Sequence, residues 1–164
     1  MTPESWRKGE MAVLGLGRSG EAASRLLRAH HATVYASDAA RTPEVEAVAA
    51  GLRAAGVETQ TGGHDLGRIA RASLVVTSPG IPGNAPALVA AGAEVAVDFT
   101  SVEAARENLR FGAEQGIHMV VGTTGFTPDE MSELDAMFAA GAANAIIAPN
   151  FSIGAVLMMR FAEM

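Results

Sequence analysis

The stretch Met11-Ala12-Val13-Leu14-Gly15-Leu16-Gly17-Arg18-Ser19-Gly20 is a short apolar run that leads into the pattern G-x-G-x-x-G and then into helix-forming sequence. In such a pattern Gly15 permits a tight turn, Gly17 lets the backbone approach a phosphate, and Gly20 lets the following helix pack close to the strand. The free amides and the positive dipole end of that helix then form an anion site. The alternative is a glycine-rich turn that serves packing alone.

A carboxylate follows this turn at the sequence spacing that is typical of dinucleotide-binding domains. The β-type run 33–37 ends at Asp38, 18 residues after Gly20. An acid at this position hydrogen-bonds the ribose of a dinucleotide, and it favours NAD over NADP. The alternative role for Asp38 is a turn carboxylate that caps nearby amides. Arg41 could bind a 2′-phosphate, although an arginine in a surface turn is also common.

The composition is that of an alanine-rich globular protein. The chain has 164 residues, 49% hydrophobic and 18% charged, which is the size of one domain. A net charge of -6 and a pI near 5.2 argue against nucleic acid or an anionic membrane as a partner. The chain has no cysteine, no leader-like start and no apolar run of roughly 18 residues. We therefore expect a cytoplasmic protein.

Apolar runs alternate with stretches of helical period along the whole chain. The expected strands are residues 13–16, 34–37, 57–61, 73–77, 94–99, 119–121 and 145–148. The expected helices are residues 21–30, 43–55, 65–71, 86–91, 100–113, 127–138 and 152–163. N-cap patterns at Thr42-Pro43, Thr100-x-x-Glu103 and Thr127-Pro128-x-Glu130 support three of the helix starts.

This alternation is typical of an α/β fold with a doubly wound parallel sheet and helices on both faces. We expect a single Rossmann-like domain over residues 1–164, with about seven strands in the order 3-2-1-4-5-6-7. The ligand crevice should lie at the carboxyl ends of strands 1 and 4.

Four segments of the first half carry a family resemblance: VLGLGRSG (13–20), SD (37–38), GGHD (62–65) and VTSPGIP (76–82). Together, residues 11–92 resemble the N-terminal domain of UDP-N-acetylmuramoyl-alanine D-glutamate ligase. The resemblance implies a domain that holds the UDP of the substrate and does no chemistry itself. The ATP-binding loop of that family has no counterpart here, and the sole lysine is Lys8.

Three motifs of the second half carry a different resemblance: VDFT (97–100), VGTTGF (121–126) and APNFSIG (148–154). From about residue 93 the chain looks like the cofactor domain of 4-hydroxy-tetrahydrodipicolinate reductase. The resemblance implies loops that touch the nicotinamide half of NAD(P)H, with Thr124 also facing substrate. That family's catalytic segment, a His-His pair followed by Lys and a D-A-P-S-G-T run, is expected shortly after residue 164 and is not found in the sequence.

The two resemblances place different strands beside strand 1. In the reductase family the Asp-Phe-Thr strand, here Asp98-Phe99-Thr100, lies there, whereas residues 73–82 supply an additional strand before it. If that additional strand takes the place, Thr100 and Thr124 move outward by one strand, about 4.8 Å. Their contacts with a cofactor depend on this choice.

We therefore expect a chimera of two Rossmann domains joined near residues 90–93, with an engineered origin favoured over a natural fusion. Because the catalytic segments of both families are absent, we expect a binding module and not an enzyme. The expected ligand is NAD or NADP. A UDP-type nucleotide or UDP-sugar, and a scaffold without a specific ligand, are the alternatives.

The expected nucleotide-binding residues are Gly15, Leu16, Gly17, Arg18, Ser19, Gly20, Asp38, Ser78, Gly80, Thr100, Gly122, Thr124 and Asn150. No catalytic residue is expected: the pair His30-His31 ends the first expected helix, where a histidine cation satisfies the helix dipole. His64 and His118 lack metal-ligand spacing. The expected partner is a small-molecule nucleotide. A homodimer is also expected, through the terminal helix 152–163 or the edge strand 145–148, because several methionines there have no partner domain.

Overall fold

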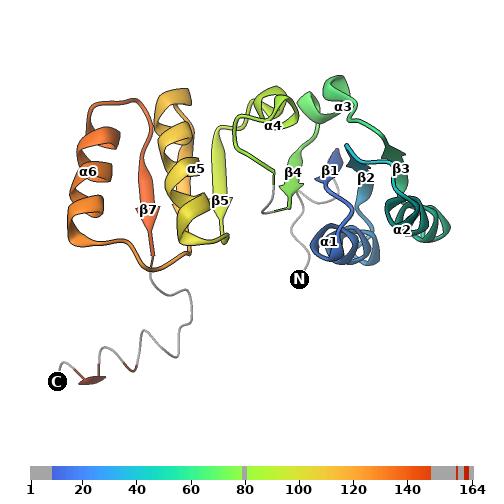
Figure 1. The fold of residues 1–164 in the computed structure, drawn as a ribbon, viewed down its shortest axis with the longest axis horizontal. Coiled ribbons are helices and arrows are strands. Elements are labelled where there is room, and N and C mark those ends of the chain that lie inside the picture. The colour runs from blue at the N-terminus through green and yellow to red at the C-terminus, as the bar shows by residue number, and fades with distance from the viewer. Residues whose placement is uncertain (1–8, 79–80, 149–157, 159–160, 163–164) are drawn as a thin grey trace. The chain divides into compact units, whose positions relative to one another are not determined.

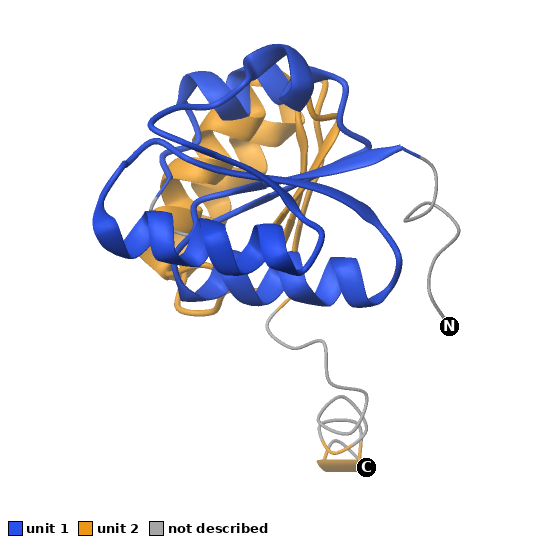
Figure 2. Ribbon diagram, turned by 90° about the vertical axis from the view of Figure 1, so that its right-hand side faces the viewer, with its two compact units in different colours: residues 1–92 blue, residues 93–164 orange. Residues whose placement is uncertain are grey.

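The computed structural model describes residues 9–78, 81–148, 158 and 161–162 of the chain. It divides into two compact units, residues 1–92 and 93–164, which Figure 2 shows in different colours. Each unit forms a parallel sheet of its own.

The first unit alternates strands with helices and has the sheet order β3-β2-β1-β4 (Figure 1). Its strands are β1 (Glu10–Leu14), β2 (Thr33–Asp38), β3 (Glu58–Thr61) and β4 (Leu74–Thr77). Its helices are α1 (Arg18–Ala29), α2 (Pro43–Ala54), α3 (Leu66–Ala70) and α4 (Pro86–Ala91).

Helices cover both faces of this sheet because alternate residues of the buried strands point to opposite sides. On one face, Met11 and Val13 of β1 belong to a core cluster that includes Leu52 of α2 and Leu27 of α1. On the other face, β1 and β2 pack with α3 and α4 in a separate cluster. Four strands with helices on both sides form the doubly wound arrangement that the sequence predicts.

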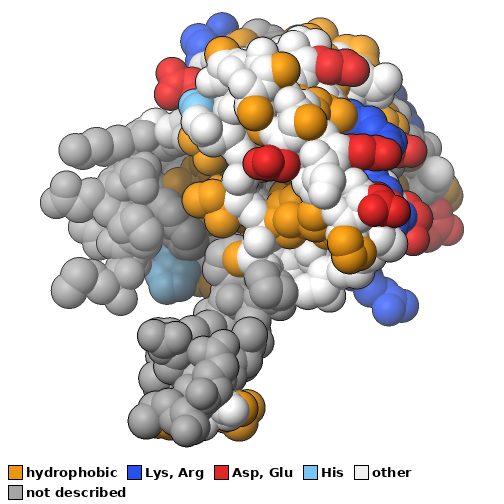
Figure 3. Space-filling model, turned by 90° about the vertical axis from the view of Figure 1, so that its left-hand side faces the viewer, with side chains coloured by type: hydrophobic (Ala, Val, Ile, Leu, Met, Phe, Trp, Pro, Cys, Tyr) orange, Lys and Arg blue, Asp and Glu red, His pale blue; other side chains and the backbone are white. Residues whose placement is uncertain are grey.

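The second unit has the sheet order β5-β6-β7. Its elements are β5 (Val95–Asp98), α5 (Val102–Gln115), β6 (His118–Val121), α6 (Pro128–Ala139) and β7 (Ala145–Ile147). Leu109 of α5 and Phe138 of α6 pack with one face of this sheet. The opposite face exposes Val95, Val97 and Ile146, whose exposed fractions are 55%, 63% and 62%. Figure 3 shows the side of the chain that is on the left in Figure 1, where acidic and apolar side chains are interspersed.

The prediction of an α/β, Rossmann-like fold with seven strands and flanking helices is confirmed. The predicted single sheet in the order 3-2-1-4-5-6-7 is wrong in one respect: among the described residues the strands form two sheets, 3-2-1-4 and 5-6-7. Apolar runs show where strands lie, but they carry little information on which strand pairs with which, because pairing is set by long-range packing.

The strand beside β1 is β4, with Leu14 opposite Thr77. The other edge of β1 pairs with β2, so both edges of β1 are occupied within the first unit. The additional strand of residues 73–82 therefore takes the place that the reductase resemblance assigns to Asp98-Phe99-Thr100.

Most helix starts agree with the predicted caps. Thr42 accepts a hydrogen bond from the amide of Val45, and Thr127 forms a complete capping box with Glu130. The predicted cap at Thr100 is wrong, because Ser101 caps α5 and the Thr100 hydroxyl and amide both donate to Asp98. The predicted helix 152–163 lies outside the described residues except at 158, 161 and 162. Within the described segments, no helix reaches the length and apolar character that crossing a bilayer requires.

Candidate functional site

Two of the three motif glycines are required by the packing of the turn itself. Gly15 has φ of +89°, and a Cβ there would lie 2.6 Å from the Ser78 hydroxyl oxygen. A Cβ on Gly20 would lie 1.7 Å from the carbonyl oxygen of Gly15, so any side chain would collide with backbone. The turn is further fixed by the Gly15 amide, which donates to the Ser37 carbonyl at 2.8 Å.

The middle glycine is different, because a Cβ on Gly17 would meet no atom within 4 Å. The protein itself therefore does not need glycine there, and the space above Gly17 is open to a ligand. Gly17 is the N-cap of α1, and no side chain caps this helix end. Arg18 and Ser19 lie exposed in the first turn. The uncapped amides and the dipole of a 12-residue helix favour an anionic group at this point.

Asp38 connects the end of β2 to the glycine turn. Its Oδ2 accepts the backbone N–H of Leu16 at 2.7 Å, and its Oδ1 accepts the N–H of Ala40 at 2.8 Å. The carboxylate is half-buried and lines the cleft described below. The amide-capping role considered for Asp38 is thus present in this structure, and the remaining lone pairs are available for a ribose hydroxyl.

A cleft of about 610 Å³ opens at the carboxyl ends of β1, β2 and β4, where parallel α/β sheets bind ligands. Gly15, Gly17 and Asp38 form part of its wall. The remaining lining residues of the first unit are Ala39, His64, Leu66, Ser78, Ile81, Pro82, Ala85, Pro86 and Ala87. Because its lining combines a few polar side chains with mostly apolar ones, the cleft can hold both a phosphate-bearing group and an aromatic base.

His64 is a cleft residue that the sequence reasoning assigned to structure alone. Its Nδ1 lies 2.8 Å from the Ser37 hydroxyl, which places the ring beside the end of β2. Burial lowers the pKa of His64, while the nearby charge of Asp38 opposes this effect. The signal in the sequence is its place directly after β3 and the pair Gly62-Gly63, at the same edge of the sheet as Asp38.

The structure gathers the predicted residues Gly15 to Gly20, Asp38 and Ser78 at one corner of the first unit. Ser78 follows β4, and its amide donates to the Leu14 carbonyl at 3.0 Å. The predicted residues Gly80 and Asn150 lie outside the described residues.

Three predicted residues, Thr100, Gly122 and Thr124, belong to the second unit. There the buried carboxylate of Asp98 accepts bonds from Thr100 and from the Asn108 amide group. The Gly122 amide donates to the Asp98 carbonyl at 2.8 Å, and Thr124 is exposed. In this arrangement Asp98 organises the loop after β5.

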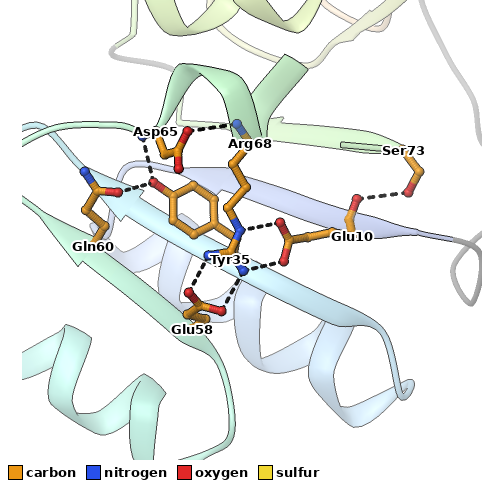
Figure 4. A network of polar contacts seen from close by, with 7 residues as sticks. All are labelled: Glu10, Tyr35, Glu58, Gln60, Asp65, Arg68 and Ser73. Atoms are coloured by element: carbon orange, nitrogen blue, oxygen red, sulfur yellow. Dashed lines mark hydrogen bonds and ion pairs between the residues drawn. The ribbon is translucent and has the colours of Figure 1, made fainter. Parts of the chain in front are cut away.

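A second polar cluster in the first unit fastens α3 to the sheet (Figure 4). Arg68 forms ion pairs with Glu10 and Glu58, which begin β1 and β3, and its guanidinium lies 4.5 Å from the centroid of the Tyr35 ring. The two carboxylates raise the pKa of Arg68, and the bond from Arg68 lowers the pKa of Glu58. The charges of Arg68, Glu10 and Glu58 are thus paired with one another, and the cluster ties α3 to the starts of β1 and β3.

Comparison with known proteins relates the chain to reductases. It is 54% identical to the 4-hydroxy-tetrahydrodipicolinate reductase of Streptococcus suis over 70 residues, which are 43% of this chain and 28% of that protein. It is 55% identical to the enzyme of the same name from Nocardia farcinica over 73 residues, 44% of this chain and 29% of that protein. The matched stretch therefore spans less than a third of these curated relatives.

Solved structures share the fold. The chain matches a D-isomer specific 2-hydroxyacid dehydrogenase from Lactobacillus delbrueckii, solved in an NAD complexed form, with a TM-score of 0.52 and 18% identity over 91% of this chain and 48% of that one. It matches an imine reductase from Myxococcus stipitatus, solved with NAD+, with a TM-score of 0.55 and 16% identity over 95% of this chain and 62% of that one. At such identities the likeness establishes the fold alone.

These findings correct one prediction. The expectation that the chain is not an enzyme is wrong, because the relatives that it matches are named reductases. The physical reason is that a cofactor domain supplies the binding of the hydride donor, while acid and base groups of a reductase can come from other segments. The lack of the family's catalytic segment in this sequence was therefore not evidence about the class of the protein.

The cofactor prediction and the family agree. The predicted cofactor, NAD or NADP, is confirmed at the level of the family. The family model described as "Dihydrodipicolinate reductase, N-terminus" matches residues 10–151, so the reductase likeness extends through both units and not only through the second. Because that match covers most of the chain, the chain belongs to the family of dihydrodipicolinate reductase N-terminal domains.

Proposed function

We propose that this chain is the cofactor-binding domain of an oxidoreductase that reduces 4-hydroxy-tetrahydrodipicolinate or a closely similar cyclic substrate with NAD(P)H. The substrate class rests on the names of the relatives. The observation that carries the proposal is the open position above Gly17 at the uncapped start of α1, directly beside the cleft. A pyrophosphate fits this place, because glycine removes the one side chain that would fill it.

Different residues of the cleft would bind different parts of the cofactor. The first-turn amides of α1, with Arg18 and Ser19, would hold the diphosphate, and Asp38 would accept a ribose hydroxyl. Leu66, Ile81 and Pro82 offer an apolar wall to the base. A bound NAD(P)H would supply the hydride from its nicotinamide ring. The other expected contacts, Ser78, Gly80, Thr100, Gly122, Thr124 and Asn150, rest on the family motifs alone and stay predictions.

A second candidate is a UDP-type nucleotide bound at the same corner, in a chimera of two Rossmann domains. Two observations favour it. The strand beside β1 is β4 of the ligase-like half and not the Asp98-Phe99-Thr100 strand. The boundary between the two compact units falls between Gly92 and Ala93, within the seam of residues 90–93 that the motifs predict. An engineered origin, a cytoplasmic location and a homodimer stay predictions.

The test is a thermal-shift and calorimetric panel with NADH, NADPH, UDP and UDP-N-acetylmuramoyl-alanine. The proposal predicts saturable binding of NADH or NADPH and none of the UDP compounds at matched concentration. Binding of UDP without NADH or NADPH would establish the second candidate instead. A chain that binds none of the four would contradict both.

A further inference from the structure

The loop beyond Asp38 contains a cation, Arg41, that is not among the residues lining the cleft. Ala39 lines the cleft, and Arg41 follows three residues after Asp38 in the loop between β2 and α2. In dinucleotide sites an arginine in this loop accommodates the 2′-phosphate of NADP. The location of the Arg41 guanidinium therefore bears on which cofactor the site takes.

Glu46 holds Arg41 away from that role. The Arg41 Nε donates to Glu46 Oε1 at 3.1 Å. The same Oε1 accepts the Thr61 hydroxyl at 2.6 Å, and Oε2 lies 3.5 Å from Arg53 Nη2. The Glu46 carboxylate is thus fixed from β3, from α2 and from the loop, and Arg41 is one of two cations that it engages.

The neighbours of Glu46 stabilise its charged form. The hydrogen bond from Thr61 lowers the pKa of Glu46, with the charges of Arg41 and Arg53 acting in the same direction and desolvation opposing them. Glu46 is therefore ionised at neutral pH and attracts Arg41.

The carboxylate of Asp38, which lines the cleft, would repel a 2′-phosphate. Both of its oxygens accept backbone amides, at 2.7 and 2.8 Å, so the group cannot turn away from a ligand without breaking a hydrogen bond. A 2′-phosphate placed beside it meets a like charge, and the cation that would compensate is paired with Glu46.

We propose that the cleft prefers NAD to NADP, and that Glu46 is a positioning residue that sustains this preference by engaging Arg41. The inference rests on the proposed function, since it concerns the same cleft. It assigns a role in cofactor choice to a side chain on α2 that does not line the cleft.

The test is a pair of calorimetric titrations, NADH and NADPH, on the full chain and on Glu46→Gln. The parent chain should bind NADH about tenfold more tightly than NADPH. Glu46→Gln keeps an acceptor for Thr61 but removes the charge that holds Arg41, so the NADPH/NADH ratio of dissociation constants should fall at least about threefold. Adding Arg41→Ala should restore the parent ratio.

Two further variants separate cofactor choice from simple destabilisation. Glu44→Gln, a neighbouring acid of the same helix turn whose partner is Thr42, should leave the ratio unchanged. Ala39→Arg adds a cation at the cleft wall and should lower the ratio without touching Glu46. A lower melting temperature in Glu46→Gln with an unchanged ratio would overturn the inference and assign Glu46 a structural role.

The outcomes also distinguish this inference from the function on which it rests. Equal affinity for NADH and NADPH in the parent chain would overturn the inference and leave the proposed function standing. If neither cofactor binds, the proposed function itself fails.

Discussion

Asp38 Oδ2 accepts the backbone N–H of Leu16 at 2.7 Å, and this bond joins the end of β2 to the glycine turn after β1. Leu16 is 1% exposed, so its amide has little access to water as a substitute partner. The carboxylate that faces the ligand cleft therefore also maintains the shape of the phosphate-binding turn.

Asp38→Ala should consequently affect stability and binding together. Leaving the Leu16 amide unsatisfied should cost about 1 to 3 kcal/mol of unfolding free energy, and affinity for NADH should fall because the turn loses its anchor. Urea unfolding and calorimetry measure the two effects. Ser101→Ala, which removes the cap of α5 in the second unit, serves as control: it should cost about 1 kcal/mol and leave affinity unchanged. Unaltered NADH affinity in Asp38→Ala would show that the turn does not depend on this bond.

Gly17 and Gly20 should differ sharply in the loss of unfolding free energy that an added methyl group causes. Gly20→Ala places a methyl group where the Gly15 carbonyl lies, 1.7 Å away, so it should cost about 3 kcal/mol or more. Gly17→Ala meets no atom within 4 Å and should cost less than about 1 kcal/mol, chiefly through the weaker N-cap. Equal losses in urea unfolding would contradict the packing described for the turn.

Stability should decrease on mild acidification because of His64. Burial lowers the pKa of His64 below its ordinary value of 6.5, so the folded protein binds fewer protons than the unfolded chain as the pH falls through that value. The contribution of neutral His64 is complete above pH 6.5 and is lost as the pH drops toward and below the folded pKa. Urea unfolding at about pH 7.5 and about pH 5.5 measures the slope. His64→Gln should flatten it, and an equally steep slope in the variant would assign the effect to another group.

The open face of the second sheet should promote association at high concentration. Val97 and Ile146 are 63% and 62% exposed, and β7 has an unpaired edge among the described strands. Contiguous apolar surface and free strand edges favour self-association. Light scattering over about a hundredfold range of concentration should show a rising mass, which Ile146→Lys should reduce. A constant monomer mass in the parent chain would contradict the predicted homodimer.

The sequence predicted those parts of the site that depend on local chemistry. Gly15, Gly17 and Gly20 constrain a turn within ten residues of chain, and Asp38 follows from the end of a strand that must lie beside the first. The N-caps at Thr42 and Thr127 depend only on neighbouring amides, and both were predicted.

Contacts between distant segments were not predictable in this way. The bond between Asp38 and Leu16, the placement of His64 beside Ser37, and the pairing of Glu46 with Thr61 each join residues that are 15 or more positions apart. The pairing of β4 with β1 belongs to the same class. Such contacts are fixed by the packing of whole helices and strands, which residue types alone do not specify.

Binding of a dinucleotide above Gly17 can be measured by a calorimetric titration of NADH into the parent chain, Gly17→Val and Gly141→Val. Gly141 is a matched control, because it is exposed in the second unit and a Cβ there meets nothing closer than 3.8 Å. We expect saturable binding in the parent chain and in Gly141→Val, and loss of binding in Gly17→Val with a native far-UV spectrum. Undiminished NADH affinity in Gly17→Val would contradict this expectation.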